Sequence, residues 1–440
     1  MCNRWNILFA TLLVAGITIP ACGQTRGEFA KPETVGLSSD RLAALDAAMQ
    51  DDVDQKRKAG MVVLVARHGK IAHLKSFGMS NIEASKPMTV DAVFRLHSQS
   101  KPMVSVGLLM LYEQGKFALN DPLENYIPSF AKLKVADVGP GGAVTLRSPR
   151  RKPTILDALR HTTGFPATSA LAQWGGPVEK IWMAASDSFQ GQDLAAQMEL
   201  LADLPLAHDP GTDWRYGPSH DVQGRLIEIF SGMSLGDYMR ERVFKPLKLK
   251  DTGYVVSPAM MARYTTVYVP DGKGSLVASD KPEGSWYIRS AQIPSGSSGI
   301  SSTAYDQFRF GQMLLDGGEL DGVRLLSRKT VEMMLTNQLP AEIKAMRLHP
   351  NYTFAGFGYG LGISVVTDLA TSGRLTSLGA ASWGGSSTTD MVVDPQEDMI
   401  IVSLAQYRPG QTPWWQRAEN GAYQALIDSP GWKKRPRVPQ

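Results

Sequence analysis

The stretch VFRLHSQSKPMVSVGLLMLYEQG, residues 93–115, joins a reactive residue pattern to a strongly apolar helix. From Ser98 to Gln114 the apolar residues recur at helical spacing, and Gly115 stands where a helix ends. Ser98 and Lys101 are three residues apart, so both side chains lie on one helix face and the lysine amine can take the serine proton. The serine amide also lies at the helix N-terminus, where unpaired backbone donors and the helix dipole favour a developing negative charge.

Two other patterns offer competing nucleophiles. Ser129 and Lys132 repeat the same spacing but lead into a polar loop, which leaves the amine charged in water, so we interpret this copy as accidental. Ser234 lies in GMSLG, which matches the GxSxG elbow of α/β-hydrolases. An elbow needs a buried strand before it, whereas the preceding segment has helical spacing. We therefore expect Gly232 to end one helix and Ser234 to cap the next.

The segments around the opening stretch predict a mixed fold. A serine cap and helical spacing indicate a helix over 38–53, and alternating apolar residues indicate two strands over 61–78, joined at His68 and Gly69. Near the C-terminus strand patterns return, the last of them with a hairpin turn at Asp394, and a helix closes the chain. These later segments are 358–366, 374–385, 391–406 and 415–427.

The middle of the chain differs from both ends. From Leu119 to about Pro282, helical runs alternate with loops rich in proline and glycine. We therefore expect an α/β (α+β) catalytic lobe, an antiparallel sheet flanked by helices, formed by residues 30–118 and 284–440. A helical lobe, residues 119–283, is inserted into it.

Composition excludes several classes of function. The 440 residues are 43% hydrophobic and 20% charged, which is enough for a sizeable core. The net charge is +4, and the short basic clusters at 147–152 and 433–437 lack interleaved aromatic residues, so we expect no nucleic-acid partner. Seven scattered histidines, without a Cys/His cluster, predict no metal or other cofactor.

The N-terminus predicts export. Arg4 precedes an apolar run over 7–19, and small residues follow, as in a secretory signal spanning 1–23. A run of this length is too short to cross a bilayer, which takes about 20 residues. Cys22 resembles the lipidated cysteine of a bacterial lipoprotein box, and ordinary cleavage at Gly23 is the alternative. We expect a periplasmic protein that contacts the membrane only if Cys22 carries a lipid.

Four further motifs follow the opening stretch along the chain: PTILDALRHTTGFP, WRYGPSHDVQG, SGSSGISSTAYDQF and SWGGSSTTDM. Together, over residues 32–407, they resemble the serine β-lactamase-like hydrolases, which comprise class C β-lactamases, penicillin-recognising DD-peptidases and family VIII carboxylesterases. The resemblance is nearest to the carboxylesterases. It implies a catalytic α/β lobe beside a helical lobe, with the active site between them.

The resemblance assigns roles to three side chains. Ser98 matches the family nucleophile, Lys101 its lysine, and Tyr216 in WRYGP the tyrosine of the second motif. In lactamases that motif is YxN, but here Pro218 occupies the third position. The resemblance implies acyl transfer through Ser98, with Lys101 and Tyr216 sharing the serine proton, and either of the two can be the base.

The third motif departs further. Trp383-Gly384-Gly385 stands where lactamases and DD-peptidases carry KTG, and the next residue, Ser386, would supply one oxyanion amide, the other coming from Ser98. Tryptophan removes the cation that could hold a β-lactam carboxylate and offers an apolar wall instead. Esterases of the family commonly carry WxG here, so the resemblance implies hydrolysis of small carboxylic esters.

Two alternatives stay open: a class C-type β-lactamase or DD-peptidase, and a penicillin-binding-like protein that binds ligands without turnover. Ser186-Asp187-Ser188 resembles an SDN element but lacks similar surroundings, so we interpret it as a helix-flanking loop. His97 and His161 are taken as packing residues without a catalytic role.

Overall fold

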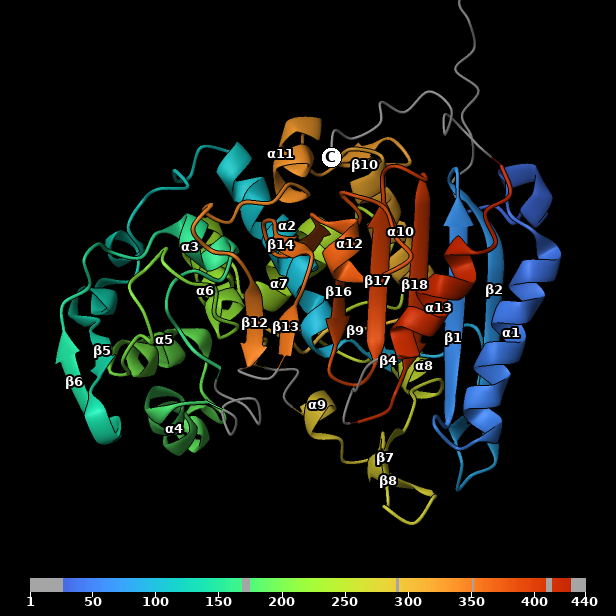
Figure 1. The fold of residues 1–440 in the computed structure, drawn as a ribbon, viewed down its shortest axis with the longest axis horizontal. Coiled ribbons are helices and arrows are strands. Elements are labelled where there is room, and N and C mark those ends of the chain that lie inside the picture. The colour runs from blue at the N-terminus through green and yellow to red at the C-terminus, as the bar shows by residue number, and fades with distance from the viewer. Residues whose placement is uncertain (1–26, 168–174, 290–292, 350–351, 409–413, 429–440) are drawn as a thin grey trace, which may run out of the picture.

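The computed structural model describes residues 27–167, 175–289, 293–349, 352–408 and 414–428. The predicted leader with Cys22, and the basic cluster at 433–437, lie outside these ranges. At the centre is an antiparallel sheet in the order β14-β15-β16-β17-β18-β1-β2-β3 (Figure 1). Its strands are β1 (Gly60–Arg67), β2 (Lys70–Asn81), β3 (Lys86–Pro87), β14 (Phe357–Tyr359), β15 (Ser364–Val366), β16 (Ala381–Gly385), β17 (Thr389–Asp394) and β18 (Met399–Ala405).

The sheet pairs strands from the N-terminal and C-terminal parts of the chain, and β1, β17 and β18 are buried along their whole length. β1 pairs with β18 in antiparallel register, with Leu64 opposite Val402. Because successive side chains alternate between faces, Met61 and Val63 pack against one core, whereas Val62 and Leu64 pack against another. Burying each such side chain contributes about 1.5–3 kcal/mol, so the strand pair is strongly held.

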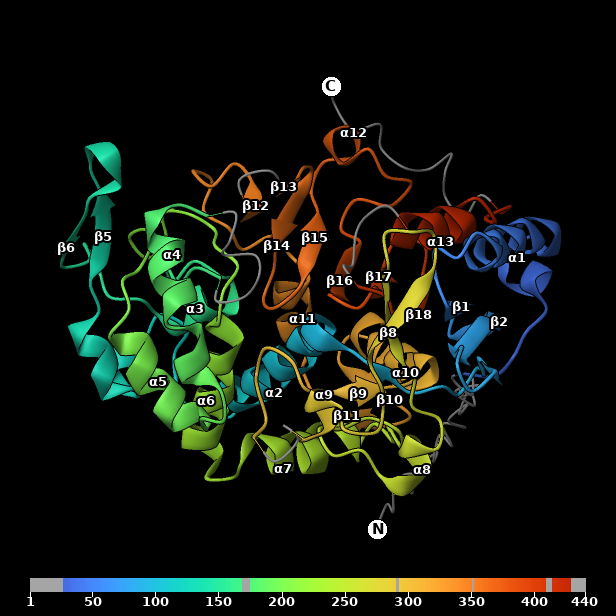
Figure 2. The same cartoon turned by 90° about the horizontal axis from the view of Figure 1, so that it is seen from below.

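Helices cover the two faces. The helices α1 (Ser39–Asp54) and α13 (Trp414–Tyr423) supply residues to the core on one face. α10 (Ala304–Leu315) packs on the other face, where apolar residues of α2 (Lys101–Glu113) join the same core (Figure 2). The mixed α/β class predicted from the sequence is confirmed.

The predicted local signals have clear structural counterparts. Ser38 caps α1 by accepting a hydrogen bond from the amide of Arg41, and Gly115, with φ +71°, follows α2. The β1–β2 and β17–β18 hairpins turn where predicted. The stretch 358–366 is a hairpin of β14 and β15 rather than one strand, and only the last five residues of 374–385 form a strand, β16.

The segment 119–283 contains helices that pack beside α2, together with β structure that the sequence analysis missed. The helices are α3 (Ile155–Leu159), α4 (Pro177–Ala184), α5 (Leu194–Ala202), α6 (Ser219–Ser231), α7 (Leu235–Met239) and α8 (Pro258–Met261). The loop VGPGGAV connects β5 (Val135–Val138) to β6 (Val144–Arg147), and β7 (Val267–Pro270) pairs with β8 (Leu276–Asp280). These strands of four or five residues are too short for alternation to stand out from loop sequence.

Candidate active site

Ser98 lies in a tight turn at the start of α2. The strand β4 (Phe94–Arg95), paired with β9 (Ser301–Ser302), leads into a 3₁₀ turn, His97–Ser100, which continues as α2. His97 has φ +48°, a left-handed conformation that costs a non-glycine residue about 1–3 kcal/mol. The helix therefore begins later than predicted, and a bent backbone presents Ser98 partly exposed ahead of it.

Three predicted side chains meet at this turn. Lys101 is buried, and its Nζ donates hydrogen bonds to Ser98 Oγ at 3.1 Å and to the carbonyl of Ser297 at 2.7 Å. The hydroxyl of Tyr216 donates to Ser98 Oγ at 2.6 Å. Lys101 Nζ also lies 4.8 Å from the centre of the Tyr216 ring. The serine oxygen thus accepts hydrogen bonds from both groups that the resemblance assigns to proton transfer.

β16 brings the third motif against the same turn. Trp383 is buried, and its ring lies 5.7 Å from that of Tyr216. At Gly385 an added Cβ would lie 2.0 Å from the carbonyl oxygen of Leu96, so only glycine lets the strand approach the turn this closely. Ser386 is exposed in the turn that follows β16, and Gly384 pairs with Asp390 of β17.

Several buried side-chain rings pack around Tyr216. The buried His161 ring lies 5.0 Å from Tyr216, 5.6 Å from Trp214 and 5.4 Å from Tyr359. Burial, assisted by the charge of Lys101, holds the pKa of His161 well below its usual range, so the imidazole is neutral. The prediction that His161 packs fits these contacts. Tyr359 was missed, because nothing in its local sequence links it to a residue 143 positions earlier.

The other serines that the sequence raised lie elsewhere. Ser234 caps α7: its Oγ accepts from the amide of Asp237 at 3.1 Å, and Gly232 ends α6 with φ +70°. Lys132 pairs with Asp203 at 2.7 Å rather than with Ser129. The Ser186–Phe189 segment is a 3₁₀ turn directly after α4, and His97 packs its ring edge-to-face against Tyr287, 4.9 Å away.

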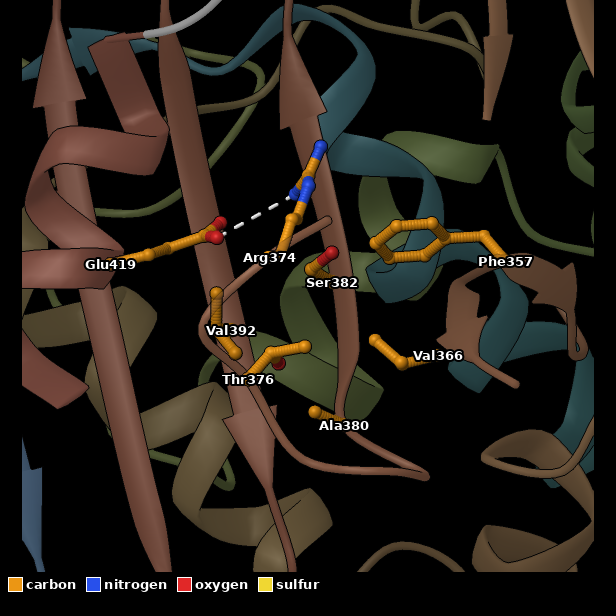
Figure 3. Close-up of a pocket in the computed structure, with 8 residues that line it drawn as sticks. All are labelled: Phe357, Val366, Arg374, Thr376, Ala380, Ser382, Val392 and Glu419. Atoms are coloured by element: carbon orange, nitrogen blue, oxygen red, sulfur yellow. Dashed lines mark ion pairs between the residues drawn. The ribbon is translucent and has the colours of Figure 1, made fainter. Parts of the chain in front are cut away.

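A small pocket is lined by residues of the sheet together with Arg374, Thr376 and Glu419 (Figure 3). Its lining includes Ser382 and Val392, whose neighbours Trp383 and Met391 point to the other face of the sheet, where Trp383 packs near Tyr216. Within this lining, Arg374 approaches Glu419 at 3.6 Å. Burial and the nearby Asp390 carboxyl raise the pKa of Glu419 to about 8.

Neither a metal centre nor a membrane span is found within the described ranges. No group of three or more His, Cys, Asp or Glu side chains there is arranged to hold a metal ion. None of the helices in the same residues combines the length and apolar character needed to cross a bilayer.

An antiparallel sheet flanked by helices, with serine, lysine and tyrosine meeting beside it, defines the serine hydrolases of the β-lactamase/transpeptidase type. The chain belongs to the Beta-lactamase family, whose model matches residues 45–425. The resemblance inferred from the sequence is therefore confirmed.

Two relatives align with most of the chain. The chain is 32% identical over 366 residues to protein Rv1367c of Mycobacterium tuberculosis (strain ATCC 25618 / H37Rv), covering 82% of this chain and 89% of that protein. It is 28% identical over 398 residues to esterase EstB of Burkholderia gladioli, covering 85% and 92%.

Solved structures confirm the fold. EstCE1, described as a hydrolase with promiscuous acyltransferase activity, superposes with a TM-score of 0.72 at 24% identity, over 87% of this chain and 99% of that chain. Simvastatin synthase LovD from Aspergillus terreus, unliganded as its selenomethionyl derivative, superposes with a TM-score of 0.74 at 21% identity, over 91% and 100%.

Proposed function

We propose that this protein is a serine esterase that cleaves short-chain carboxylic esters through an acyl-enzyme on Ser98. The observation that carries the proposal is the double hydrogen bond to Ser98 Oγ, from Tyr216 at 2.6 Å and from Lys101 at 3.1 Å. A serine hydroxyl is a weak nucleophile until an adjacent base takes its proton, and both candidate bases are within reach.

In the first step, Ser98 Oγ attacks the ester carbonyl carbon and its proton passes to Lys101 or Tyr216. The tetrahedral adduct collapses, the bond to the leaving oxygen breaks, and the alkoxide takes that proton and departs as an alcohol. Water then attacks the acyl carbonyl and gives a proton to the same pair. That proton returns to Ser98 Oγ as the acid leaves. The backbone amides of Ser98 and Ser386 are the proposed oxyanion donors.

The surroundings of Ser98 favour esters over β-lactams. Trp383, which occupies the place of the lactamase lysine, lies 6.0 Å from Phe354 and 5.7 Å from Tyr216, ring centre to ring centre. These rings form an apolar wall that suits an acyl chain and offer no cation for a lactam carboxylate. The similarity to an esterase of Burkholderia gladioli supports the same substrate class.

The test compares p-nitrophenyl butyrate with nitrocefin for the wild type, Ser98→Ala and the control Ser234→Ala. We expect ester cleavage that Ser98→Ala abolishes and Ser234→Ala retains. Efficient nitrocefin opening with negligible ester cleavage would instead indicate a β-lactamase or DD-peptidase. A stable acyl adduct on Ser98, detected by mass spectrometry, would indicate a penicillin-binding-like protein without turnover.

Transfer of the acyl group to an alcohol is a second candidate activity, because an acyl-enzyme reacts with either nucleophile. The relation to EstCE1, whose description includes promiscuous acyltransferase activity, motivates the assay. Adding butanol to the esterase reaction would yield a butyl ester if the acceptor is accepted, and only free acid if water is the sole acceptor.

For location, we propose export to the bacterial periplasm. The support is the leader pattern of residues 1–23, and lipidation of Cys22 is the alternative to free release. Radiolabelled palmitate incorporated into the wild type but not into Cys22→Ser would establish an anchor. Recovery of the protein in the cytoplasmic fraction would refute export.

A further inference from the structure

A short segment across the site from α2, residues 295–300 with the sequence SGSSGI, holds the Lys101 amine in place. We call this segment the strap. The carbonyl of Ser297 accepts a hydrogen bond from Lys101 Nζ at 2.7 Å, which is shorter than the 3.1 Å bond from the same nitrogen to Ser98 Oγ. The position of the amine therefore depends on where this one carbonyl points.

The carboxylate of Asp221, in the first turn of α6, fixes the strap at Ser297. One carboxylate oxygen accepts hydrogen bonds from Ser295 Oγ at 2.7 Å and from the amide of Ser297 at 3.2 Å, and the other accepts from Ser297 Oγ. Asp221 is 7% exposed, so little water competes for these donors. These bonds hold the amide and side chain of Ser297, directly beside the carbonyl that binds Lys101.

The rest of the strap is anchored independently. The hydroxyl of Tyr254 donates to the carbonyl of Ser295 at 2.9 Å. The Tyr287 hydroxyl accepts from the amide of Gly299 at 2.9 Å and donates to the carbonyl of Ile300 at 3.0 Å. At Gly296 an added Cβ would lie 1.8 Å from the carbonyl oxygen of His220, so the strap runs directly against α6. Loss of Asp221 would thus free Ser297 while both ends of the strap stay attached.

We propose that Asp221 is a positioning residue for Lys101, acting through Ser297. Its carboxylate orients the Ser297 carbonyl, that carbonyl holds the lysine amine, and the amine is held beside the serine oxygen. The inference rests on the proposed function, because it assumes that Lys101 shares the proton of Ser98. It predicts that Asp221 affects the chemical step while leaving substrate binding almost unchanged.

The test uses Asp221→Asn, which keeps the shape of the side chain but replaces one acceptor oxygen by a donor. Since misplacement of a reacting group by about 1 Å can cost about 100-fold in rate, we expect kcat on p-nitrophenyl butyrate to fall by about 10- to 100-fold. The KM is expected to change less than about threefold. Glu228→Gln, two turns along α6 and bonded to the amide of Leu235 instead of the strap, is the matched control and should keep wild-type kcat.

A double-mutant comparison separates positioning from general support of the fold. If Asp221 acts only through the lysine, adding Asp221→Asn to Lys101→Ala should not slow the residual reaction of Ser98 with a fluorophosphonate any further. Additive losses would overturn the proposal, as would an Asp221→Asn enzyme with kcat within about twofold of wild type.

Two further measurements cover the case of a variant that does not fold and the case of a wild type without activity. If Asp221→Asn does not fold, as judged by its melting curve, Ser297→Ala removes one of the same hydrogen bonds and should lower kcat in the same direction. An unchanged kcat in that variant would overturn the proposal. If the wild type reacts with none of the ester, nitrocefin and the fluorophosphonate, the proposed function itself is wrong. If the wild type is active and Asp221→Asn is equally active, only the role proposed for Asp221 is wrong.

Discussion

Replacing Gly385 by alanine should damage the site without touching any of its reactive groups. The added methyl would lie 2.0 Å from the Leu96 carbonyl oxygen and 2.6 Å from Thr389 Oγ1. A real Cβ essentially never approaches a heavy atom closer than 3.0 Å, so β16 and the Ser98 turn must separate by about 1 Å. The Leu96 carbonyl cannot yield easily, because it already accepts hydrogen bonds from the Gln99 amide at 3.1 Å and from Thr389 Oγ1 at 3.2 Å.

The expected cost has two parts. Overpacking of a tight contact typically costs about 1–3 kcal/mol of folding stability. A shift of about 1 Å between the Ser98 turn and β16 should lower kcat/KM by about 100-fold, because Ser386 and Trp383 move away from the serine. Activity should therefore fall far more than the folded fraction at 25 °C, where most of the variant remains native.

The assay measures kcat/KM on p-nitrophenyl butyrate, the labelling rate with a fluorophosphonate, and urea unfolding. Gly253→Ala is the control, because its added Cβ would be no closer than 3.6 Å to the carbonyl oxygen of Val255, an ordinary contact. A Gly385→Ala variant that keeps both rates within about twofold of wild type and unfolds at the same urea concentration would refute the steric argument.

Three further predictions concern stability. Ser234→Ala should leave esterase activity unchanged but cost about 1 kcal/mol in urea unfolding, because it removes the cap of α7; an inactive but stable variant would contradict this. Burial holds the pKa values of His161 and His220 well below 6.5, so the unfolded chain binds more protons below that pH. His161→Phe should therefore reduce the loss of stability between about pH 6.5 and 5, and an unchanged slope would contradict the assignment. Burial raises the pKa of Glu419, so folding takes up a proton above the unfolded carboxyl value of about 4.3. Glu419→Gln should gain stability relative to wild type as urea unfolding is repeated from about pH 5 to 7, and a difference independent of pH would refute the raised pKa of Glu419.

The part of the site that lies within one stretch of chain could be predicted from local spacing. Ser98 and Lys101 are separated by one turn of backbone, and the spacing that puts both on one helix face is visible in the sequence. Ser234 could be set aside for the same reason, because the glycine and serine around it have local roles as helix stop and helix cap. Tyr216 is 118 residues from Ser98, and its place followed from the family resemblance rather than from physical reasoning on the sequence.

The part that depends on backbone atoms or on packing between distant elements could not be predicted. Lys101 is held by the carbonyl of Ser297, and a carbonyl group belongs to every residue, so no side-chain pattern marks it. Asp221 follows Tyr216 by five residues, but its function depends on a strap more than 70 residues later. Tyr359 in β14 and His161 after α3 lie 198 positions apart and are brought together only by packing between distant elements.

The strand β16 carries side chains to both faces of the sheet, so the acid pair on one face and the site on the other share one backbone. Trp383 and Gly385 face Tyr216 and the Ser98 turn, while Ser382 and the Glu419 carboxyl border the pocket on the other face. A strand cannot shift on one face alone, since its side chains share one backbone. The raised pKa of Glu419 and the nearby Arg374 both limit like-charge repulsion between Glu419 and Asp390 on this face. We therefore expect deprotonation of Glu419 at high pH to destabilise the packing of β16, the strand that brings Gly385 against the carbonyl of Leu96.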